Sequence, residues 1–326
     1  MTLYAKDSAL SLLRSMIRRD RLPHAFIIFG ERGVGKKTLA REMARLILCQ
    51  NGGEACAPDI SAACPACRMM LKEIHPDFIV KTPGGKSGNY LSEDLRAIIS
   101  DSSVTPSEGD KKIYFLPNVD KALPEAQNML LKIVEEPPPH VMFIMTAESK
   151  EMILPTILSR VISLGITEPS EDECLAALIE SGKSRESAKE AVSVFGGNIG
   201  RCLEYIENGC ELEYLQAVKN AVSALAGRDE YRLLAVFGGI EKQGRAVILD
   251  VLAELKSVLR DVTAEKLGTR LCSCCRDGAR TLSATVRQSA VEKMYDAVGD
   301  AERKIRGNAS VPIALSDLCG KLSIYL

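Results

Sequence analysis

A glycine-rich segment near the start of the chain has the spacing of a phosphate-binding loop. Gly30, Gly35 and Lys36 match the pattern Gly-x4-Gly-Lys. In such a loop, backbone N–H groups and the N-terminus of the following helix bind phosphate oxygens, and the lysine reaches the outer phosphates. The residue after the lysine is usually Ser or Thr, whose hydroxyl holds magnesium, but here it is Lys37, and Thr38 follows one place late. One helical residue is a rotation of about 100°. The loop therefore predicts phosphate or nucleotide binding with a misplaced hydroxyl, and a plain strand-to-helix turn is the alternative.

The acids that nucleotide hydrolysis needs are missing from their expected place. Phosphoryl transfer uses an Asp at a strand end to hold magnesium and a neighbouring side chain to orient water. The apolar strand expected at 112–116 runs instead into Pro117 and Asn118, neither of which can act as a base. Asp120 comes slightly later and is typical of an acid at a helix start. We therefore expect no ATP hydrolysis by this chain alone, and magnesium is not expected to be held.

Four cysteines have the spacing of a metal site. They follow the pattern Cys-x6-Cys-x7-Cys-x2-Cys in a loop rich in Gly, Ala and Pro, and they are Cys49, Cys56, Cys64 and Cys67. The segment Cys64-Pro65-Ala66-Cys67 suits two thiolates on one tetrahedral metal ion, and the other two cysteines would complete the shell. Because four thiolates leave no open position, the expected metal is a structural zinc. The alternative is four thiols without a ligand.

An arginine near the end of the strand-rich region is a second candidate for phosphate chemistry. Arg160 follows Ser159, between an expected helix end and the last expected strand. An arginine in this place can project from the edge of a domain and contact a phosphate on a neighbouring subunit. Taken alone, however, a surface arginine is usually only a solvated charge.

Strand and helix patterns alternate from residue 24 to residue 165. Apolar strands are expected at 24–29, 77–80, 112–116, 141–145 and 161–164, and helices at 37–48, 91–100, 124–136 and 154–160. Near-continuous apolar strands that alternate with helices are typical of a parallel sheet covered on both faces. This α/β domain, expected at 1–166, would place the glycine-rich loop after its first strand.

The strand patterns stop after Gly165. Ser170 and Glu173 have the spacing of a capping box that opens a helix reaching about residue 180. Further helices are expected at 184–195 and 199–207, which together give a small helical lid domain at 167–208. The rest of the chain, 209–326, is expected to be a helical collar domain, with its clearest helices at 246–265 and 285–306 and a loop at 268–278.

Composition narrows the class of protein. A chain of 326 residues is long enough for two or three domains. Its net charge of −1 argues against a protein that coats nucleic acid by itself. The basic residues Lys36, Lys37, Arg41 and Arg45 are therefore expected to form a solvated helix face, and a local basic face that binds nucleic acid is the alternative.

Targeting patterns and cysteine usage predict a cytoplasmic protein. The sequence has no run of 18 apolar residues and no signal-peptide core. The 11 cysteines are then expected to be reduced, so a cluster of them suggests metal rather than disulfides. Three cysteines without a fourth partner at a suitable spacing are expected to be incidental thiols: Cys272, Cys274 and Cys275.

Six stretches of the chain, taken together, resemble the clamp-loader branch of the AAA+ proteins, in particular the delta prime subunit family of bacterial DNA polymerase III. The resemblance covers about residues 22–165, and the helical remainder fits the family's lid and collar domains by length. The matching stretches are Leu22 to Phe26, Gly30 to Lys36, the insertion at 49–67, Ala126 to Lys132, Glu135 to Pro138, and Leu154 to Arg160.

The resemblance implies a non-hydrolysing arm of a loader that places a ring-shaped sliding clamp on primed DNA. The expected partners are the gamma/tau and delta subunits, with clamp and DNA reached through the assembled complex. The family's Ser-Arg motif matches Ser159 and Arg160, and this arginine is expected to act in trans at the ATP site of the adjoining gamma/tau subunit. The motif's usual third residue, Cys, is replaced here by Val161.

The resemblance also assigns residues to the chain's own nucleotide site. The first sensor position falls at Thr146, and the second sensor region places Arg201 toward a nucleotide. Together with the loop, the candidate nucleotide-binding residues are Gly30, Gly33, Gly35, Lys36, Thr38, Thr146 and Arg201. Because the loop keeps its lysine, binding of ATP or ADP without hydrolysis remains an alternative for this chain.

Two other functions remain as alternatives. One is an ATP-hydrolysing, gamma/tau-like motor subunit of the same complex, which Pro117 and Asn118 disfavour. The other is a stand-alone, zinc-containing DNA-binding module, which the near-neutral charge disfavours.

Overall fold

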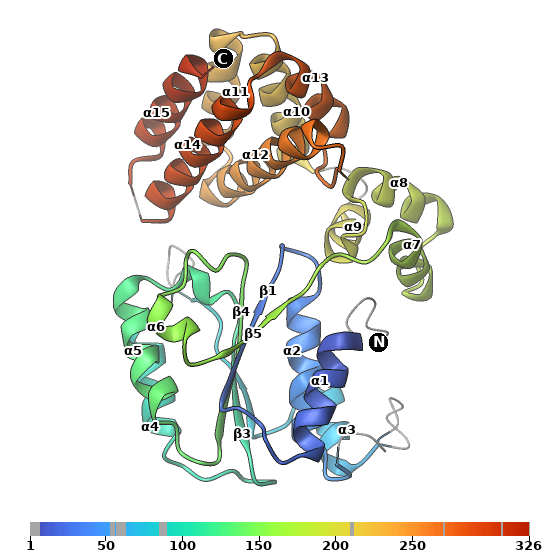
Figure 1. Cartoon of the computed structure of the whole chain (residues 1–326), viewed down its shortest axis with the longest axis vertical. Helices are drawn as coiled ribbons and strands as arrows, with labels where there is room; N and C mark the ends of the chain where they lie inside the picture. Colours follow the sequence, from blue (N-terminus) through green and yellow to red (C-terminus); the bar gives the residue numbers. More distant parts are fainter. Residues whose placement is uncertain are drawn as a thin grey trace. The chain divides into compact units, whose positions relative to one another are not determined.

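The chain folds into two compact units. The computed structural model describes residues 7–52, 56, 63–84, 90–208, 212–269, 271–307 and 309–325. The first unit is Met1–Pro169 and the second is Ser170–Leu326 (Figure 1). The expected lid–collar boundary at 208/209 adjoins residues 209–211, which lie outside the described residues, as does much of the insertion between Cys49 and Cys67. The division into three domains stays a prediction.

The first unit is built on one parallel sheet. Its strand order is β2-β3-β4-β1-β5, and each neighbouring pair is parallel. The strands are β1 (Ala25–Phe29), β2 (Phe78–Val80), β3 (Lys112–Leu116), β4 (Val141–Ala147) and β5 (Ile162–Gly165). The central strands β1, β3 and β4 are buried along their whole length. The predicted α/β fold with a parallel sheet is therefore confirmed.

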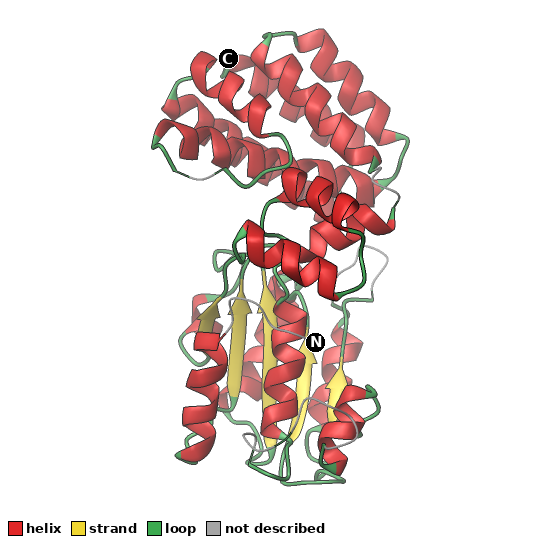
Figure 2. Ribbon diagram, turned by 90° about the vertical axis from the view of Figure 1, so that its right-hand side faces the viewer, coloured by secondary structure: helices red, strands yellow, loops and turns green. Residues whose placement is uncertain are grey.

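Helices cover both faces of this sheet (Figures 1 and 2). Successive residues of β1 alternate between the faces, so that Phe26 and Ile28 pack in the core with α1 and α2, and Ile27 packs in the core with α4 and α5. The helices are α1 (Asp7–Arg18), α2 (Lys36–Ile47), α3 (Pro65–Leu71), α4 (Ser92–Asp101), α5 (Pro124–Glu135) and α6 (Pro155–Leu158), with a 3-10 turn at Val119–Lys121. The sequence patterns did not predict α1 or α3, and the helix predicted at 154–160 is longer than the observed α6.

The second unit is entirely helical in the residues that the structure describes. The capping box is confirmed, because the Ser170 hydroxyl accepts from the N–H of Glu173 and the Glu173 carboxylate accepts from the N–H of Ser170. The predicted loop at 268–278 is wrong at its end, because α13 begins at Arg276. The helices are α7 (Glu171–Glu180), α8 (Arg185–Phe195), α9 (Ile199–Glu207), α10 (Glu213–Ala226), α11 (Glu230–Glu241), α12 (Arg245–Lys266), α13 (Arg276–Thr285), α14 (Gln288–Arg306) and α15 (Val311–Ile324).

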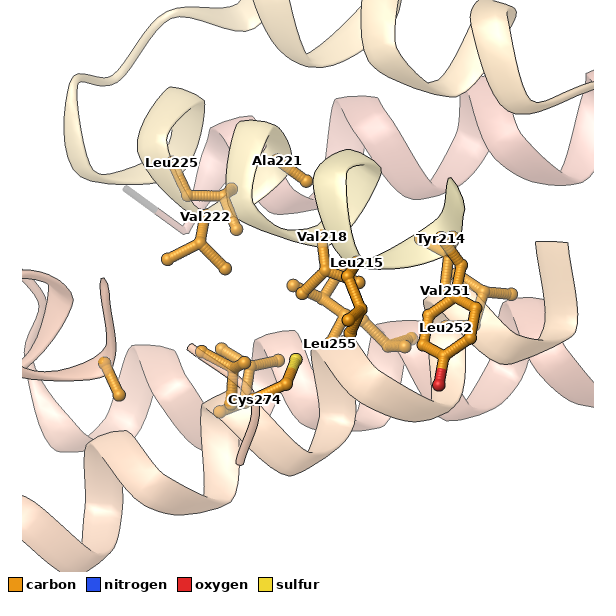
Figure 3. Packing of buried hydrophobic residues seen from close by; sticks show 14 of the residues in the cluster. Tyr214, Leu215, Val218, Ala221, Val222, Leu225, Val251, Leu252, Leu255 and Cys274 are labelled. Carbon is orange, nitrogen blue, oxygen red and sulfur yellow. The ribbon is translucent and has the colours of Figure 1, made fainter. Parts of the chain in front are cut away.

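A single hydrophobic core joins the helices of the second unit. It includes buried residues from α7 through α15. Figure 3 shows Leu215 and Val218 of α10 pointing toward Leu252 and Leu255 of α12. The expected lid and collar helices therefore share one core. Among the described helices, none is long and apolar enough to span a membrane.

Candidate functional site

The glycine-rich loop joins β1 to α2, as the sequence predicts. Gly33 and Gly35 have φ of 87° and 88°, values that L side chains rarely adopt. Gly30 is needed for a different reason, because a Cβ there would lie 2.7 Å from the carbonyl oxygen of Ile166. The three glycines are thus explained by the backbone path of the loop alone. Thr38 is half-buried in the first turn of α2.

The lysine of the loop is buried and bonded to the loop itself. Lys36 Nζ donates to the carbonyl oxygens of Gly30 at 2.6 Å and Glu31 at 2.8 Å. Burial lowers the pKa of Lys36, and the nearby carboxylates of Glu148 and Asp120 oppose that shift. Lys36 is only 6% exposed, so the prediction that it belongs to a solvated helix face is wrong. A phosphate at this loop would compete with two carbonyl groups for the ammonium.

Thr146, which the resemblance assigns to the first sensor position, connects the ends of β3 and β4 by a hydrogen bond. The N–H of Asn118 donates to Thr146 Oγ1 at 3.0 Å, and Thr146 is fully buried. Asn118 has a left-handed backbone with φ of 58°. The Tyr90 hydroxyl donates to the carbonyl of Pro117 at 2.6 Å. These contacts fix the segment where an Asp-Glu pair would stand, but they place no carboxylate at 117 or 118.

Two acids that sequence analysis did not assign to the site lie near Lys36. Asp120, in the 3-10 turn, accepts a hydrogen bond from the N–H of Glu148, which follows β4. Burial raises the pKa of Asp120, and the charge of Glu148 adds to this, while Lys36 lowers it. Both acids could have been assigned to the site from the sequence, because they follow strands whose carboxyl ends meet at the same sheet edge as the loop.

Arg160 lies between α6 and β5, as predicted. Its Nη2 is 2.9 Å from Glu135 Oε1 at the end of α5. Its Nη1 donates to the carbonyl oxygen of Thr156 at 3.0 Å and to Ser159 Oγ at 3.0 Å. The side chain is still 41% exposed. The Ser-Arg motif therefore forms a local network on the surface of the first unit.

Arg201 belongs to the second unit and has its own partner there. It forms an ion pair with Glu254 of α12, and its guanidinium lies 5.0 Å from the ring centroid of Phe195. Both charged side chains are largely buried, at 11% and 3% exposed. A nucleotide-binding role for Arg201 stays a prediction. In this structure the guanidinium links α9 to α12.

The four cysteines converge as predicted. Their sulfur atoms all lie within 4.8 Å of one another, and the Sγ atoms of Cys49 and Cys64 are 3.9 Å apart. Zn–S bonds of about 2.3 Å in a tetrahedron place sulfurs about 3.8 Å apart, so the donor set fits zinc. All four residues are buried, and they form a small cluster of their own.

Neighbouring N–H groups support the cysteine cluster. Burial alone would raise the pKa of the Cys64 thiol, but the N–H groups of Cys67 and Gln50 donate to its sulfur, and the pKa falls to about 6. The N–H of Cys64 donates to Cys56 Sγ at 3.1 Å. Such donors stabilise thiolate ligands.

Arg45 of α2 also contacts this cluster. Its Nη1 donates to Cys67 Sγ at 3.4 Å, and its Nε donates to Glu42 at 2.8 Å. Arg45 is 7% exposed, so its predicted place on a solvated face is wrong. Its charge would offset part of the negative charge of a four-thiolate site.

Cys272, Cys274 and Cys275 are three of the seven cysteines outside the cluster, and the first of them is bonded to Asp261. The Asp261 carboxylate accepts from the N–H groups of Cys272 and Ser273. Burial raises the pKa of Cys274 to about 12 and also raises that of Cys275. Within the described part of the chain, the group that could hold a metal is the set at 49–67.

Comparisons with known proteins show the family to which the chain belongs. The family model for the DNA polymerase III, delta subunit, matches residues 5–170, just over half of the chain. The DNA polymerase III subunit delta' of Bacillus subtilis (strain 168) is 26% identical over 312 residues, which cover 93% of this chain and 91% of that protein.

Gamma/tau proteins are similar over a shorter stretch. The DNA polymerase III subunit gamma/tau of Mycoplasma genitalium is 30% identical over 181 residues, which cover 56% of this chain but 29% of that protein. The subunit delta' of Pseudomonas aeruginosa is 27% identical over 182 residues, 55% of each chain. The chain belongs to the DNA polymerase III delta subunit family and, along nearly its whole length, is similar to the delta prime clamp-loader subunit.

Proposed function

We propose that this chain is the non-hydrolysing delta prime arm of the DNA polymerase III clamp loader. The observation that carries the proposal is the segment after β3. There, Pro117 and Asn118 stand where a motor subunit needs acids, and Asn118 N–H is bonded to Thr146 Oγ1. Without a carboxylate at that strand end, magnesium and the attacking water lack their usual ligands.

In this proposal, Arg160 works on a neighbouring subunit. Its guanidinium is partly exposed at the edge of the first unit, where Ser159 and Thr156 hold one terminal nitrogen. An arginine supplied in trans stabilises the charge that develops on a transferring phosphoryl group. The chain would thus activate ATP hydrolysis by an adjoining gamma/tau subunit, with Ser159 supporting the arginine.

The chain's own loop has a structural role in the proposal. Lys36 bonds to the carbonyls of Gly30 and Glu31 and lies beside two acids. Bound ATP or ADP would have to displace these internal contacts. Within the first unit, Gly30, Gly33, Gly35, Thr38 and Thr146 would then hold the nucleotide only after that exchange.

A structural zinc at the four cysteines is part of the same proposal. Four buried sulfurs within 4.8 Å of one another match a closed tetrahedral shell. Zinc would connect the end of α2, through Cys49, with the start of α3, through Cys64 and Cys67. It takes no part in phosphate chemistry, because no ligand position is left open.

The proposed partners are the gamma/tau and delta subunits, and the helices of 209–326 would supply the collar contacts. The sliding clamp and primed DNA would be reached through the assembled complex. The similarity to a delta' subunit over 93% of this chain supports this assignment, because it includes the helical unit.

A motor subunit is the second candidate, favoured by the similarity to gamma/tau proteins over 56% of the chain. Purified chain with ATP and magnesium distinguishes the two. We expect turnover at the background rate from the chain alone, and a stable complex when it is mixed with the gamma/tau and delta subunits of the same organism. Turnover that disappears in Lys36→Ala would establish the motor subunit instead.

A further inference from the structure

Both terminal nitrogens of Arg160 are engaged by acceptors of its own unit. Nη1 is bonded to Thr156 O and Ser159 Oγ, and Nη2 lies 2.9 Å from Glu135 Oε1. A phosphate is bound most strongly by arginine through two parallel N–H···O bonds. A phosphate on a neighbouring subunit that uses Nη2 therefore competes with the carboxylate of Glu135 for the guanidinium.

The position of Glu135 in its own helix is electrostatically unfavourable. Glu135 is the last residue of α5, and a helix C-terminus has a partial negative charge that disfavours a carboxylate. The positive charge of Arg160 compensates both the carboxylate and the helix end. Because Glu135 is exposed and unfavourable for α5, replacing it with Gln should not unfold the chain.

We propose that Glu135 is the resting counter-ion of Arg160 and that engagement of a neighbour's nucleotide exchanges this carboxylate for phosphate. The inference rests on the proposed trans role of Arg160. Exposed ion pairs contribute little stability, so a phosphate, which carries more charge and offers several acceptor oxygens, can replace Glu135. Glu135 is then a positioning residue: it keeps the guanidinium docked on its own unit and sets a threshold for activation.

The test is Glu135→Gln in the full chain, assembled with the ATPase subunits of the same clamp loader. The amide keeps the size of the side chain and removes its charge. Basal ATP turnover, without clamp or DNA, should rise about two- to five-fold, the range that corresponds to an exposed ion pair. Turnover stimulated by clamp and primed DNA should not change, because Arg160 is already engaged in that state.

Two further variants make the readout specific. Glu136→Gln removes the same charge from the next exposed residue and should leave both rates unchanged. The double variant Glu135→Gln/Arg160→Ala should behave as Arg160→Ala alone, because Glu135 acts through the arginine. A folding defect would lower basal and stimulated rates together, so it cannot imitate a selective rise of the basal rate.

The outcomes separate this inference from the function on which it rests. An unchanged or lower basal rate in Glu135→Gln, while Arg160→Ala lowers turnover, overturns the role of Glu135 and leaves the trans arginine standing. A rise that persists in the double variant also overturns it. If Arg160→Ala leaves turnover unchanged, the proposed function of the arginine fails, and the role of Glu135 fails with it.

Discussion

Arg201 of α9 and Glu254 of α12 form a largely buried ion pair that connects the small helices of the second unit to its longest helix. The guanidinium also lies against the ring of Phe195. Removing one member of a buried pair leaves an uncompensated charge, which commonly costs about 3–5 kcal/mol. The residue that the family resemblance places at a nucleotide is therefore also expected to stabilise the helical unit.

Arg201→Met should lower the free energy of unfolding of the second unit by about 3–5 kcal/mol. Chemical denaturation followed by circular dichroism measures the change. Lys183→Ala breaks the more exposed pair between Lys183 and Glu207 and should cost no more than about 1 kcal/mol. Equal effects of the two variants would contradict the structural role of Arg201.

Lys36→Met should destabilise the first unit, because the lysine bonds two carbonyl groups of its own loop. The expected loss is about 1–3 kcal/mol, typical of hydrogen bonds from a charged donor. The neighbouring Lys37 is exposed, so Lys37→Met should stay within about 0.5 kcal/mol. Thermal unfolding of each variant without ATP measures the loss of stability, and unfolding with ATP measures any nucleotide-dependent rise in melting temperature. A large ATP-dependent rise in melting temperature, lost only in Lys36→Met, would show that the loop holds nucleotide instead.

Purified chain should contain about one zinc ion, because the cysteine sulfurs form one closed four-thiolate set. Cys64→Ser should lose most of the metal and melt at a lower temperature, since metal binding and folding are coupled. Cys272→Ser, outside the cluster, should keep the metal. Elemental analysis of the three proteins checks this. Metal-free chain with an unchanged melting temperature would contradict a structural zinc.

The surroundings of Glu302 in α14 predict that the stability of the fold depends on pH. Burial alone would raise the pKa of Glu302, but Lys256 and Arg306 outweigh it and lower the pKa below its usual value. A carboxylate with a lowered pKa in the folded state stabilises the fold above its unfolded pKa, and this contribution is lost as the pH falls through the folded pKa.

Glu302→Gln should therefore be less stable than the unchanged chain at pH 7, and the difference should shrink below about pH 4.5, the usual range for Glu. Urea unfolding at several pH values measures it. Asp300→Asn, on an exposed position of the same helix, is the control for net charge. A difference that stays constant down to pH 3 would exclude this explanation.

The parallel sheet could be predicted because its strands are short, nearly continuous apolar runs separated by helical patterns. The capping box at Ser170 could be predicted because both of its partners are local. The helix α1 was missed although Leu10 and Leu13 have helical spacing and are buried. Its apolar face gains meaning only through the core that it shares with α2 and β1.

The burial of charged groups could not be predicted from local patterns. Lys36 and Arg45 lie on a helix that, by sequence, has an ordinary charged face, yet both are buried against partners that the fold supplies. Arg45 meets Cys67, and Arg201 meets Glu254, each across a long stretch of sequence. Such pairs depend on how helices pack, whereas the cluster of four cysteines could be predicted from their spacing alone.

The central claim is that Arg160 serves the ATP site of an adjoining subunit, and one measurement tests it most directly. The full chain carrying Arg160→Ala is assembled with gamma/tau and delta subunits, and ATP turnover is measured with clamp and primed DNA. Arg96→Ala, an exposed arginine on α4, is the matched control. We expect Arg160→Ala to assemble normally and lower turnover by about 10-fold or more, while Arg96→Ala has no effect. Normal turnover in an assembled Arg160→Ala complex would contradict the account.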